Sequence, residues 1–434
     1  MKNRDIIITG LQPWDIPIGS NCKNLAAEFS KHNRVLYVNG PLDRLTLIKK
    51  RNTPSVKHRR EIISGQTPAI EKINNNLWVL NPRVVIESIS RLKSNLLFDI
   101  INKRNNKLLA REIQNVVSEL GFKDFILFND SDMFRSFYLK ELLNPSTYIY
   151  YSRDNLLAVD FWKTQGTRIE PKHMQKSDLV LTNSHYLRDL AKRFNPRSYF
   201  VGQGCDTVAY SSFNEKLRPG DMNDIPSPII GYIGSLNSLR LDLEIIRNIA
   251  IKKPEWSIVL VGPEDKVFKE SVLHNLPNVY FLGNKNEAEL PQYLSGFDVA
   301  INPQCLNQVT IGNYPRKIDE YLAMGKATVA TLTKTMEYFS EHCYLASNAF
   351  EYVEMISKAL KEDNLKKQTS RREFANQHTW ENNANAIYEK ITIKERHHDH
   401  NKKNNFQSKT ESTGSTSFNS KQSTKASSLG EMAY

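Results

Sequence analysis

The sequence predicts an α/β protein in which two doubly wound parallel sheets follow one another along the chain. Three observations lead to this prediction: the chain has 434 residues, short apolar runs alternate with helical patterns, and the alternation starts afresh after a polar stretch. One hydrophobic core rarely extends over so many residues, so two domains are expected. The restart distinguishes two tandem sheets from a single larger one.

The first domain is predicted at residues 1–213. Its opening run, DIIIT at 5–9, is followed by the helical pattern NLAAEFSKHN and by a second run, RVLYVNG, which together form a βαβ unit. Helices are also expected at 105–120 and 184–194. Further strands are expected in the runs LWVL (77–80), DFILFN (124–129), TYIYY (147–151), DLVLTN (178–183) and SYFVG (198–202).

A linker is predicted at 214–228, because NEKLRPGDMNDIPSP has three prolines, a glycine and few apolar groups. The second domain follows at 229–378, with a helix around 241–252. Its strands are expected in IIGYIG (229–234), WSIVLVG (256–262), VYFLG (279–283), DVAINP (298–303) and ATVAT (327–331).

The end of the chain is predicted to be a helix followed by a tail. WENNANAIYEKITIKE gives a helix at 379–395, and residues 396–434 are rich in Ser, Thr, Asn and Lys with almost no apolar groups. Such a segment buries too little surface to order itself, so the tail is expected to be disordered. The HHDH run at 397–400 resembles a ligand set, but a solvated polar run explains it better.

Composition favours a cytoplasmic protein without a spanning helix. There is no run of eighteen apolar residues, and the start MKNRDIIITG is too short for a secretory signal. The four cysteines are scattered without metal-binding spacing. The formal net charge of +12 implies attraction to anions, but it does not choose among nucleotides, phospholipids, nucleic acid and phosphorylated glycans.

Ligands of open α/β sheets bind at the carboxyl ends of the strands. In the second domain, GSLNSLRLD places Gly234, Ser235 and Arg240 after one strand, and VGPED places Gly262 and Pro263 after another. A glycine there lets the backbone approach a phosphate, and free N–H groups at a helix start bind anions. A tight turn explains either loop equally well.

The most specific stretch is GNYPRKIDEYLAMGKATVAT at 312–331. Pro315 suits the first turn of a helix, where Arg316 and Lys317 then oppose the helix dipole unless an anion binds beside them. Glu320 lies three residues beyond Lys317, so we expect it on the same face, where it restrains the lysine or accepts hydrogen bonds from sugar hydroxyls. An ordinary exposed Lys/Glu pair is the alternative.

This stretch resembles the P-x-K-x-x-E-Y-L-A-x-G-K-P-V-V segment of the GT-B glycosyltransferases of group 1, also called family 4. IIGYIGSLNSLRLDLEII, WSIVLVGPED, NVYFLG and LPQYLSGFDVAINP occur in the order and spacing of that family, and DLVLTNSHYLRDL and GQGCDTVAYSSF resemble segments of its first half. The opening WDIPIGSNCKNLA resembles a bacterial branch that makes surface polysaccharides. The resemblance covers residues 5–393.

The resemblance implies two Rossmann-like domains that face a cleft, with a final helix that crosses back to the first domain. The nucleotide-sugar donor would bind the second domain and the acceptor would approach the first. By position, Gly234 and Ser235 would lie against the pyrophosphate, Arg240 and Lys317 near the phosphates or sugar, and Glu320 near the ribose or sugar. Further donor contacts are expected from Gly262, Pro263, Gly312, Asn313, Tyr314 and Arg316.

The sequence departs from the family at three positions, one of which is minor: GKATV lacks the usual proline after Gly-Lys. The first Glu of the E-x7-E motif falls on Gly312, so its role in holding the transferred sugar would pass to backbone groups around Gly312 and Asn313 or to another side chain. Ser235 stands where an arginine is usual, so the phosphate clamp would rest on Arg240, Arg316 and Lys317.

Acceptor residues are expected at the strand ends of the first domain. NDSDMF spells a D-x-D motif, but a metal role is disfavoured in a GT-B arrangement, and Asn129, Asp130 or Asp132 would instead position the acceptor hydroxyl. We predict Lys317, Glu320 and Asp130 as the catalytic residues. Asp154 follows another strand, where an ion pair with Arg153 is the alternative. Gly19 and Ser20 complete the predicted acceptor side.

Two segments suggest contact with a membrane. KKRNTPSVKHRR at 49–60 could contact anionic lipid or a lipid-linked diphosphate, and the helix-like SISRLKSNLLFDIINK at 88–103 mixes apolar and basic residues. A solvated loop and ordinary core packing are the alternatives.

The predicted function is transfer of a sugar from a nucleoside-diphosphate sugar to a glycan or lipid-linked acceptor during surface-polysaccharide synthesis. The resemblance implies retention, without a metal or cofactor. We expect a protein peripheral on the inner face of the plasma membrane, with no nucleic-acid partner. The alternatives are a nucleotide-sugar 2-epimerase-like isomerase and a non-catalytic nucleotide-sugar-binding protein.

Overall fold

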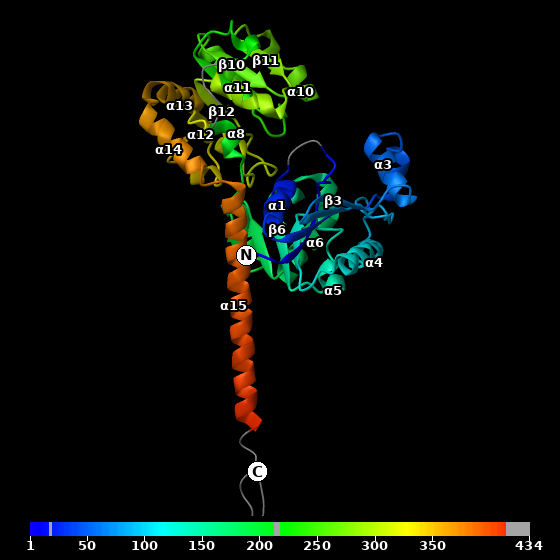
Figure 1. Ribbon diagram of the computed structural model, residues 1–434. Coiled ribbons are helices and arrows are strands. Elements are labelled where there is room, and N and C mark those ends of the chain that lie inside the picture. The colour runs from blue at the N-terminus through cyan, green and yellow to red at the C-terminus, as the bar shows by residue number, and fades with distance from the viewer. Residues whose placement is uncertain (17–19, 212–217, 414–434) are drawn as a thin grey trace, which may run out of the picture. The chain divides into compact units, whose positions relative to one another are not determined.

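The computed structural model of the chain describes residues 1–16, 20–211 and 218–413, with side chains up to residue 396. The chain divides into two compact units, Met1–Lys390 and Ile391–Tyr434. The first unit holds two separate sheets with helices on their faces (Figure 1). The predicted pair of Rossmann-like sheets in tandem is therefore confirmed.

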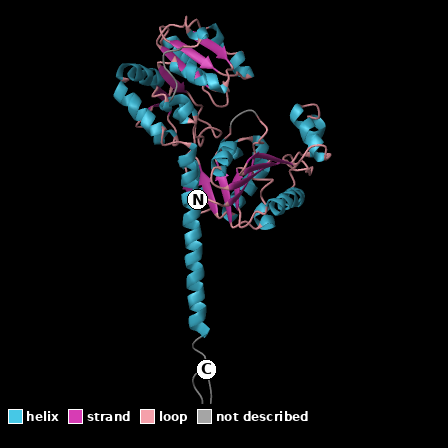
Figure 2. Ribbon diagram, viewed as in Figure 1, coloured by secondary structure: helices cyan, strands magenta, loops and turns pink. Residues whose placement is uncertain are grey.

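The N-terminal sheet has eight strands in the order β3-β4-β2-β1-β5-β6-β7-β8, and all neighbours are parallel except β3 and β4. Figure 2 shows the strands in magenta and the helices around them in cyan. Every residue of β1 and β5 is buried, as expected for strands covered on both faces. The strands are β1 (Asp5–Gly10), β2 (Arg34–Val38), β3 (Ile70–Asn74), β4 (Leu77–Leu80), β5 (Ile126–Asp130), β6 (Thr147–Ser152), β7 (Leu179–Thr182) and β8 (Ser198–Phe200).

Neighbouring residues of β5 show how helices cover both faces of this sheet. Leu127 packs in a cluster with Ile113 of α4, whereas the ring of Phe128 lies 5.7 Å from the ring of Phe29 in α1. Successive side chains of a strand point to opposite faces, so α4 and α1 cover different sides. The helices are α1 (Asn21–Ser30), α2 (Arg44–Lys49), α3 (Pro54–Ile63), α4 (Asn95–Leu120), α5 (Leu139–Leu143), α6 (Asp160–Lys176) and α7 (His185–Lys192). The next helix, α8 (Thr207–Ser211), instead places Tyr210 in the C-terminal core.

The C-terminal sheet has six parallel strands in the order β11-β10-β9-β12-β13-β14. Ile233 of β9 joins the core under α11 and α12, whereas Tyr232 joins the core under α9 and α13. The strands are β9 (Ile229–Ile233), β10 (Ser257–Val261), β11 (Val279–Gly283), β12 (Val299–Asn302), β13 (Ala327–Thr331) and β14 (Tyr344–Ala346). The helices are α9 (Leu243–Lys252), α10 (Lys266–Lys269), α11 (Leu290–Ser295), α12 (Lys317–Ala323), α13 (Ala349–Glu362) and α14 (Leu365–Ala375).

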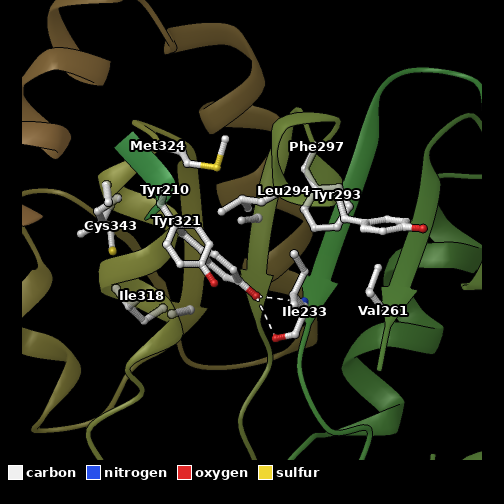
Figure 3. Packing of buried hydrophobic residues seen from close by; sticks show 14 of the residues in the cluster. Tyr210, Ile233, Val261, Tyr293, Leu294, Phe297, Ile318, Tyr321, Met324 and Cys343 are labelled. Carbon is white, nitrogen blue, oxygen red and sulfur yellow. Dashed lines mark hydrogen bonds between the residues drawn. The ribbon is translucent and has the colours of Figure 1, made fainter. Parts of the chain in front are cut away.

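A tyrosine completes the hydrogen bonding of β9 at its carboxyl end. The register of β12 against β9 ends at Ala300 opposite Gly231. Beyond it, the hydroxyl of Tyr321 in α12 accepts a hydrogen bond from the Ile233 amide at 3.0 Å and donates one to the Ile233 carbonyl at 3.4 Å (Figure 3). An unpaired buried backbone group costs about 1–3 kcal/mol, so this contact fixes α12 against the end of β9.

The structure differs from the predicted elements in several places. The prediction missed β3, whose exposed polar residues give no apolar pattern, and the three-residue β14. The helix predicted at 105–120 begins at Asn95, and residues 88–94 of the helix-like stretch are not helical. In the expected linker, residues 214–217 lie outside the described residues, and Met222 and Ile225 pack into the C-terminal core.

The final helix, α15 (Trp380–Thr413), continues beyond the predicted end at residue 395. Residues 396–413 are helical rather than disordered, because no Gly or Pro interrupts them and each further residue adds a hydrogen bond. The side chains of the HHDH run and residues 414–434 lie outside the described part of the chain.

The first turns of α15 pack on the N-terminal sheet, as the predicted crossover requires. Within the first unit, Asn383 Nδ2 donates to the Val201 carbonyl at 2.8 Å, and Asn33 Nδ2 donates to the Tyr388 hydroxyl at 3.0 Å. Among the helices of the described residues, none is both long and apolar enough to cross a membrane.

The close packing of β9 can be tested at Gly231. A Cβ at this position would lie 2.2 Å from the buried ring of Phe297. We expect Gly231→Ala to lower the free energy of unfolding by about 1–3 kcal/mol, as overpacking typically does. Chemical denaturation measures the change, and Gly220→Ala is the matched control because no atom lies within 4 Å of a Cβ there. Equal stability of the two variants would contradict the packing described.

Candidate functional site

Two glycines end β9 and β10 with backbone conformations that side chains disfavour. Gly234 has a φ of 140° and Gly262 a φ of 146°. A Cβ on Gly262 would lie 2.0 Å from the carbonyl oxygen of Gly234, and a Cβ on Gly234 would lie 2.8 Å from Lys317 Nζ. Glycine at both positions therefore lets the two strand ends and the lysine meet, and the predicted residues Gly234, Gly262 and Lys317 come together.

Lys317 is the first residue of α12, and its ammonium group points at Tyr232 of β9. Its Nζ donates a hydrogen bond to the Tyr232 hydroxyl and lies 4.0 Å from the centre of that ring. Burial lowers the pKa of Lys317 to about 7, with Glu320 acting in the opposite direction and Arg240 in the same one. The lysine is thus only partly charged at neutral pH, and an anion beside it would restore its charge.

Tyr232 also connects Lys317 to the loop after β9. Its hydroxyl donates to the carbonyl of Ser235 at 3.2 Å, and the Ser235 side chain is exposed. The next turn is closed by the Leu236 amide, which donates to the carbonyl of the exposed Pro263 at 2.8 Å. The sequence analysis did not predict a role for Tyr232. A tyrosine within an apolar strand indicates core packing, and no sequence pattern indicates the contacts of its hydroxyl group.

Glu320 pairs with Arg316 rather than with Lys317, which corrects the predicted Lys317–Glu320 pair. Arg316 Nε lies 3.0 Å from Glu320 Oε1, one helical turn away. Asp319 and Glu320 both stand in the first turn of α12, so the helix carries its own acids beside the cations. Burial raises the pKa of Glu320, although Arg316 and Lys317 act against it.

Tyr314 is enclosed in the core rather than open to a ligand. Its hydroxyl donates to the buried Asp319 carboxylate at 2.8 Å, and His378 Nδ1 lies 2.7 Å from the other oxygen of that carboxylate. The predicted donor contact at Tyr314 is therefore indirect, because the side chain helps to place α12. Asn313 is partly exposed, and its backbone N–H donates to the Thr310 carbonyl at 2.9 Å.

Gly312 packs against Tyr186 of α7, in the N-terminal domain. A Cβ at Gly312 would lie 2.7 Å from Tyr186 Cδ1, and the Gly312 carbonyl accepts a hydrogen bond from Ser184 Oγ at 2.8 Å. A glutamate at position 312 would therefore fit only if Tyr186 moved. The sequence analysis did not predict the contact between Gly312 and Tyr186, because no local pattern indicates that residues so far apart in the chain meet.

Two further polar contacts join the same parts of the two domains. Asn155 Nδ2 donates to the Gln308 carbonyl at 2.9 Å, and Lys334 Nζ lies 2.7 Å from Asp189 Oδ2. Gln308 and Gly312 both belong to the segment between β12 and α12. The loop before α12 therefore contacts the N-terminal domain at more than one residue.

Arg240 lies within electrostatic range of groups from both sheets. It is exposed, and its charge acts to lower the pKa of Lys317, Tyr232 and Asp154. Burial nevertheless raises the pKa of Asp154, with Arg153 opposing the rise. The charge of Arg240 thus acts both on Lys317 in the C-terminal domain and on Asp154 in the N-terminal domain.

Asp154 is the accessible acid of the predicted acceptor side, whereas Asp130 is enclosed. The Asp154 side chain is 30% exposed and bonds Arg153 Nη1 at 3.1 Å. Asp130 is fully buried, and its Oδ1 accepts from Arg153 Nε at 2.8 Å. Asp130 therefore holds the arginine that holds Asp154, and we interpret it as a positioning residue rather than as the catalytic residue predicted.

Asn129 and Ser20 are also buried, and their side chains make local hydrogen bonds. Asn129 Oδ1 accepts from the Asp132 amide at 3.0 Å, and Asp132 in turn binds Arg135 Nε at 2.7 Å. Ser20 caps α1 and accepts from the Lys23 amide at 3.2 Å. These side chains shape the loops around the acceptor side without reaching solvent, and Gly19 lies outside the described residues.

The residues give no indication of a metal centre. In the described ranges, no group of three or more His, Cys, Asp or Glu side chains is placed to hold a metal ion. Metal-independence stays a prediction.

Two Rossmann-like parallel sheets in tandem are the architecture of the GT-B fold of glycosyltransferases. Sucrose-phosphate synthase from Thermosynechococcus elongatus superposes with a TM-score of 0.62 at 13% identity, over 90% of this chain and 100% of that one. A UDP-forming α,α-trehalose-phosphate synthase from Burkholderia vietnamiensis gives 0.65 at 10% identity, over 91% and 100%. Anabaena HepE in complex with UDP gives 0.59 at 14% identity, over 90% and 100%. These likenesses show the fold.

Residues 227–362 match the family described as glycosyl transferases group 1. A Bacillus subtilis (strain 168) protein named as the teichuronic acid biosynthesis glycosyltransferase TuaH is 29% identical in an alignment of 211 residues that covers 46% of this chain. The match spans about half of that relative, 51% of its length. The chain thus carries a group 1 glycosyltransferase domain within a GT-B fold.

The contact between Gly312 and Tyr186 can be tested with a double-mutant cycle. Gly312→Ala should lower the free energy of unfolding by about 1–3 kcal/mol, because the added methyl group meets the ring. The loss should shrink in a Tyr186→Ala background, where the ring is absent. Urea denaturation of the four proteins measures both effects, and an equal loss in both backgrounds would exclude the contact.

The buried pair of Asp130 and Arg153 makes a second prediction. Asp130→Asn removes the buried partner of Arg153 and should cost about 3 kcal/mol of stability, as breaking a buried ion pair does. Asp99→Asn is the control, because the Asp99–Arg168 pair is 40% and 25% exposed and should contribute about 0–1 kcal/mol. Thermal and urea unfolding compare the two variants. Similar small losses would mean that Asp130 is not needed to hold Arg153.

Proposed function

We propose that the protein transfers a sugar from a nucleoside-diphosphate sugar to a hydroxyl of a glycan or lipid-linked acceptor in surface-polysaccharide synthesis. The observation that carries the proposal is the meeting of Lys317 and Gly234 at the carboxyl ends of the C-terminal sheet, where the charge of Arg240 also acts on the lysine. The structural neighbour HepE was solved with UDP and with UDP and glucose, which supports a nucleotide-sugar donor. The name of TuaH supports a polysaccharide product.

The cations of the site would stabilise the leaving group, which is the nucleoside diphosphate. As the bond between sugar and diphosphate breaks, negative charge grows on the diphosphate. Lys317, which Tyr232 holds in place beforehand, and the exposed Arg240 would stabilise that charge. Gly234 lets the backbone approach the same phosphates. Glu320, held by Arg316, would accept hydrogen bonds from the ribose or the sugar.

The acceptor would approach from the N-terminal domain. Asp154 is a partly exposed carboxylate within range of Arg240, and it would accept the hydrogen bond of the attacking hydroxyl. Backbone groups around Gly312 and Asn313 would hold the transferred sugar in place of the missing acid. The resemblance supports retention of configuration without a metal, and a cytoplasmic place at the inner face of the plasma membrane.

Incubating the purified protein with radiolabelled UDP-, GDP- and dTDP-sugars and a membrane extract tests the activity. Transfer of label to a lipid or polymer fraction is expected. Interconversion of the free donor without transfer would instead identify an isomerase, and donor binding without either outcome would identify a non-catalytic binding protein.

Lys317 makes the donor affinity depend on pH. Its pKa of about 7 means that the lysine loses its charge as the pH rises further, so UDP-glucose binding should weaken by up to about tenfold per pH unit above 7. Calorimetry in buffers of different ionisation enthalpy should show proton uptake on binding. Lys317→Arg should remove the pH dependence, because arginine stays charged.

Lys317→Ala should weaken UDP-glucose binding roughly 10- to 100-fold at pH 7, in line with the loss of one hydrogen bond to a charged group. Lys366→Ala is the control, since that lysine is exposed on α14. Unchanged affinity in Lys317→Ala would reject Lys317 as a phosphate ligand.

A further inference from the structure

A cavity of about 580 Å³ opens at the carboxyl end of the N-terminal sheet. Leu11 follows β1, Pro41 follows β2 and Asp132 follows β5, so the cavity lies at the edge of the sheet where ligands of such folds bind. Its volume falls in the range of small-molecule sites. Much of its wall is apolar, and this part is made by Leu45, Ile86, Ile89, Phe134, Phe161 and Trp162.

The carboxylates of the cavity already have partners. Asp43 accepts hydrogen bonds from Thr46 and Ser88. Glu87 lies 2.7 Å from Arg44, and Asp132 lies 2.7 Å from Arg135. The charges of Glu87 and Asp132 are therefore balanced by arginines, whereas Asp43 keeps its single negative charge beside neutral donors.

Three cations of the same cavity are not neutralised. Lys49, Lys50 and Arg91 line it and are exposed, and no ion pair joins any of them to another described residue. The charge that the cavity offers to a ligand is therefore positive, and an anionic group is the complementary ligand.

Large apolar side chains stand at this same place although solvent reaches them. Leu45 is 43% exposed and Phe161 is 53% exposed, and both line the cavity. Ile48, on the same helix as Leu45, is 64% exposed. Apolar groups gathered beside free cations fit a ligand with an apolar chain next to an anionic group. A free glycan has no such chain and would leave the apolar wall unused.

We propose that this cavity holds the first part of the apolar chain and the phosphate groups of a lipid-linked diphosphate, the acceptor of the reaction. The phosphates would lie at Lys49, Lys50 and Arg91, and the chain would run along Leu45 and Phe161. This inference rests on the proposed function in one respect, that the bound lipid carries the hydroxyl to be glycosylated. The loop after β5 connects both ends of such an acceptor, because Asp132 lines the cavity and Asp130 holds the Arg153–Asp154 pair.

Binding of farnesyl diphosphate tests the cavity directly, with inorganic pyrophosphate as the head group alone. Trp162 lines the cavity and reports through its fluorescence, and Trp162→Phe identifies its share of the signal. We expect farnesyl diphosphate to bind about tenfold or more tightly than pyrophosphate. Equal affinities would overturn the proposal, because charge alone would then be recognised.

Variants separate the apolar and the charged parts of the site. Leu45→Asp and Phe161→Asp should each weaken farnesyl diphosphate binding about tenfold, and Lys49→Glu combined with Lys50→Glu should do the same. Leu365→Asp is the matched control, because Leu365 is 74% exposed on α14, in the C-terminal domain. Thermal unfolding confirms that each variant is folded. Unchanged affinity in the two apolar variants would overturn the proposed path of the chain.

UDP-glucose calorimetry on the same proteins distinguishes this inference from the proposed function. Loss of farnesyl diphosphate binding with intact donor affinity supports a separate lipid cavity. A wild-type protein that binds farnesyl diphosphate but none of the UDP-, GDP- and dTDP-sugars would reject the donor proposal and keep the cavity. The opposite result would reject the cavity and keep the donor site.

Discussion

The hydroxyl of Tyr321 fixes the position on which the candidate site depends. It bonds both backbone groups of Ile233 where β12 has already left β9. Lys317 stands four residues before Tyr321, on the same side of α12, and Gly234 is the residue after Ile233. One side-chain contact thus sets two neighbouring pairs at once: Tyr321 against Ile233, and Lys317 against Gly234. A helix that slid by one turn would leave the strand end unpaired and the lysine away from the glycine.

That placement has an energetic consequence for the folded protein. The pKa of Lys317 falls from 10.5 to about 7, so the unfolded chain binds more protons than the folded chain between these values. The contribution of this lysine to stability therefore rises with pH across that window and is least favourable below it. The protein holds a cation where its charge is disfavoured, and a diphosphate is the kind of ligand that would remove the penalty.

The sequence was sufficient for the parts of the fold that are buried on both faces. Strands such as β1, β5 and β10 are continuous apolar runs, whereas the exposed edge strand β3 has no such pattern and was missed. The same limit applies to polar residues. Asn129 and Asp130 follow an apolar run, as ligand-binding residues do. Both side chains are nevertheless buried, because residues on and after β6 and on α6 cover them, and no local sequence pattern predicts those neighbours.

Pairings were harder to predict than positions. The meeting of Gly234 with Lys317 follows from strand ends sharing one edge of a sheet. The predicted pairing of Glu320 with Lys317 was wrong. Residues three and four positions away on a helix are both neighbours, and Glu320 pairs with Arg316, four positions before it. The neighbour of Gly312 could not be predicted at all, since Tyr186 comes from the other domain.

The polar contacts between the domains have a bearing on how a bound nucleotide could leave. The Asn155–Gln308 hydrogen bond and the Asp189–Lys334 ion pair are exposed, so water can replace them, whereas the hydrogen bond from Ser184 to Gly312 is buried. Exposed ion pairs contribute about 0–1 kcal/mol each. Moving the loop before α12 away from α7 would leave the Tyr321 contact and both cores intact, but it would expose the Ser184–Gly312 hydrogen bond and the ring of Tyr186 to water. Nucleotide release by this route would therefore combine the exchange of exposed polar contacts for solvent with the opening of one small buried patch.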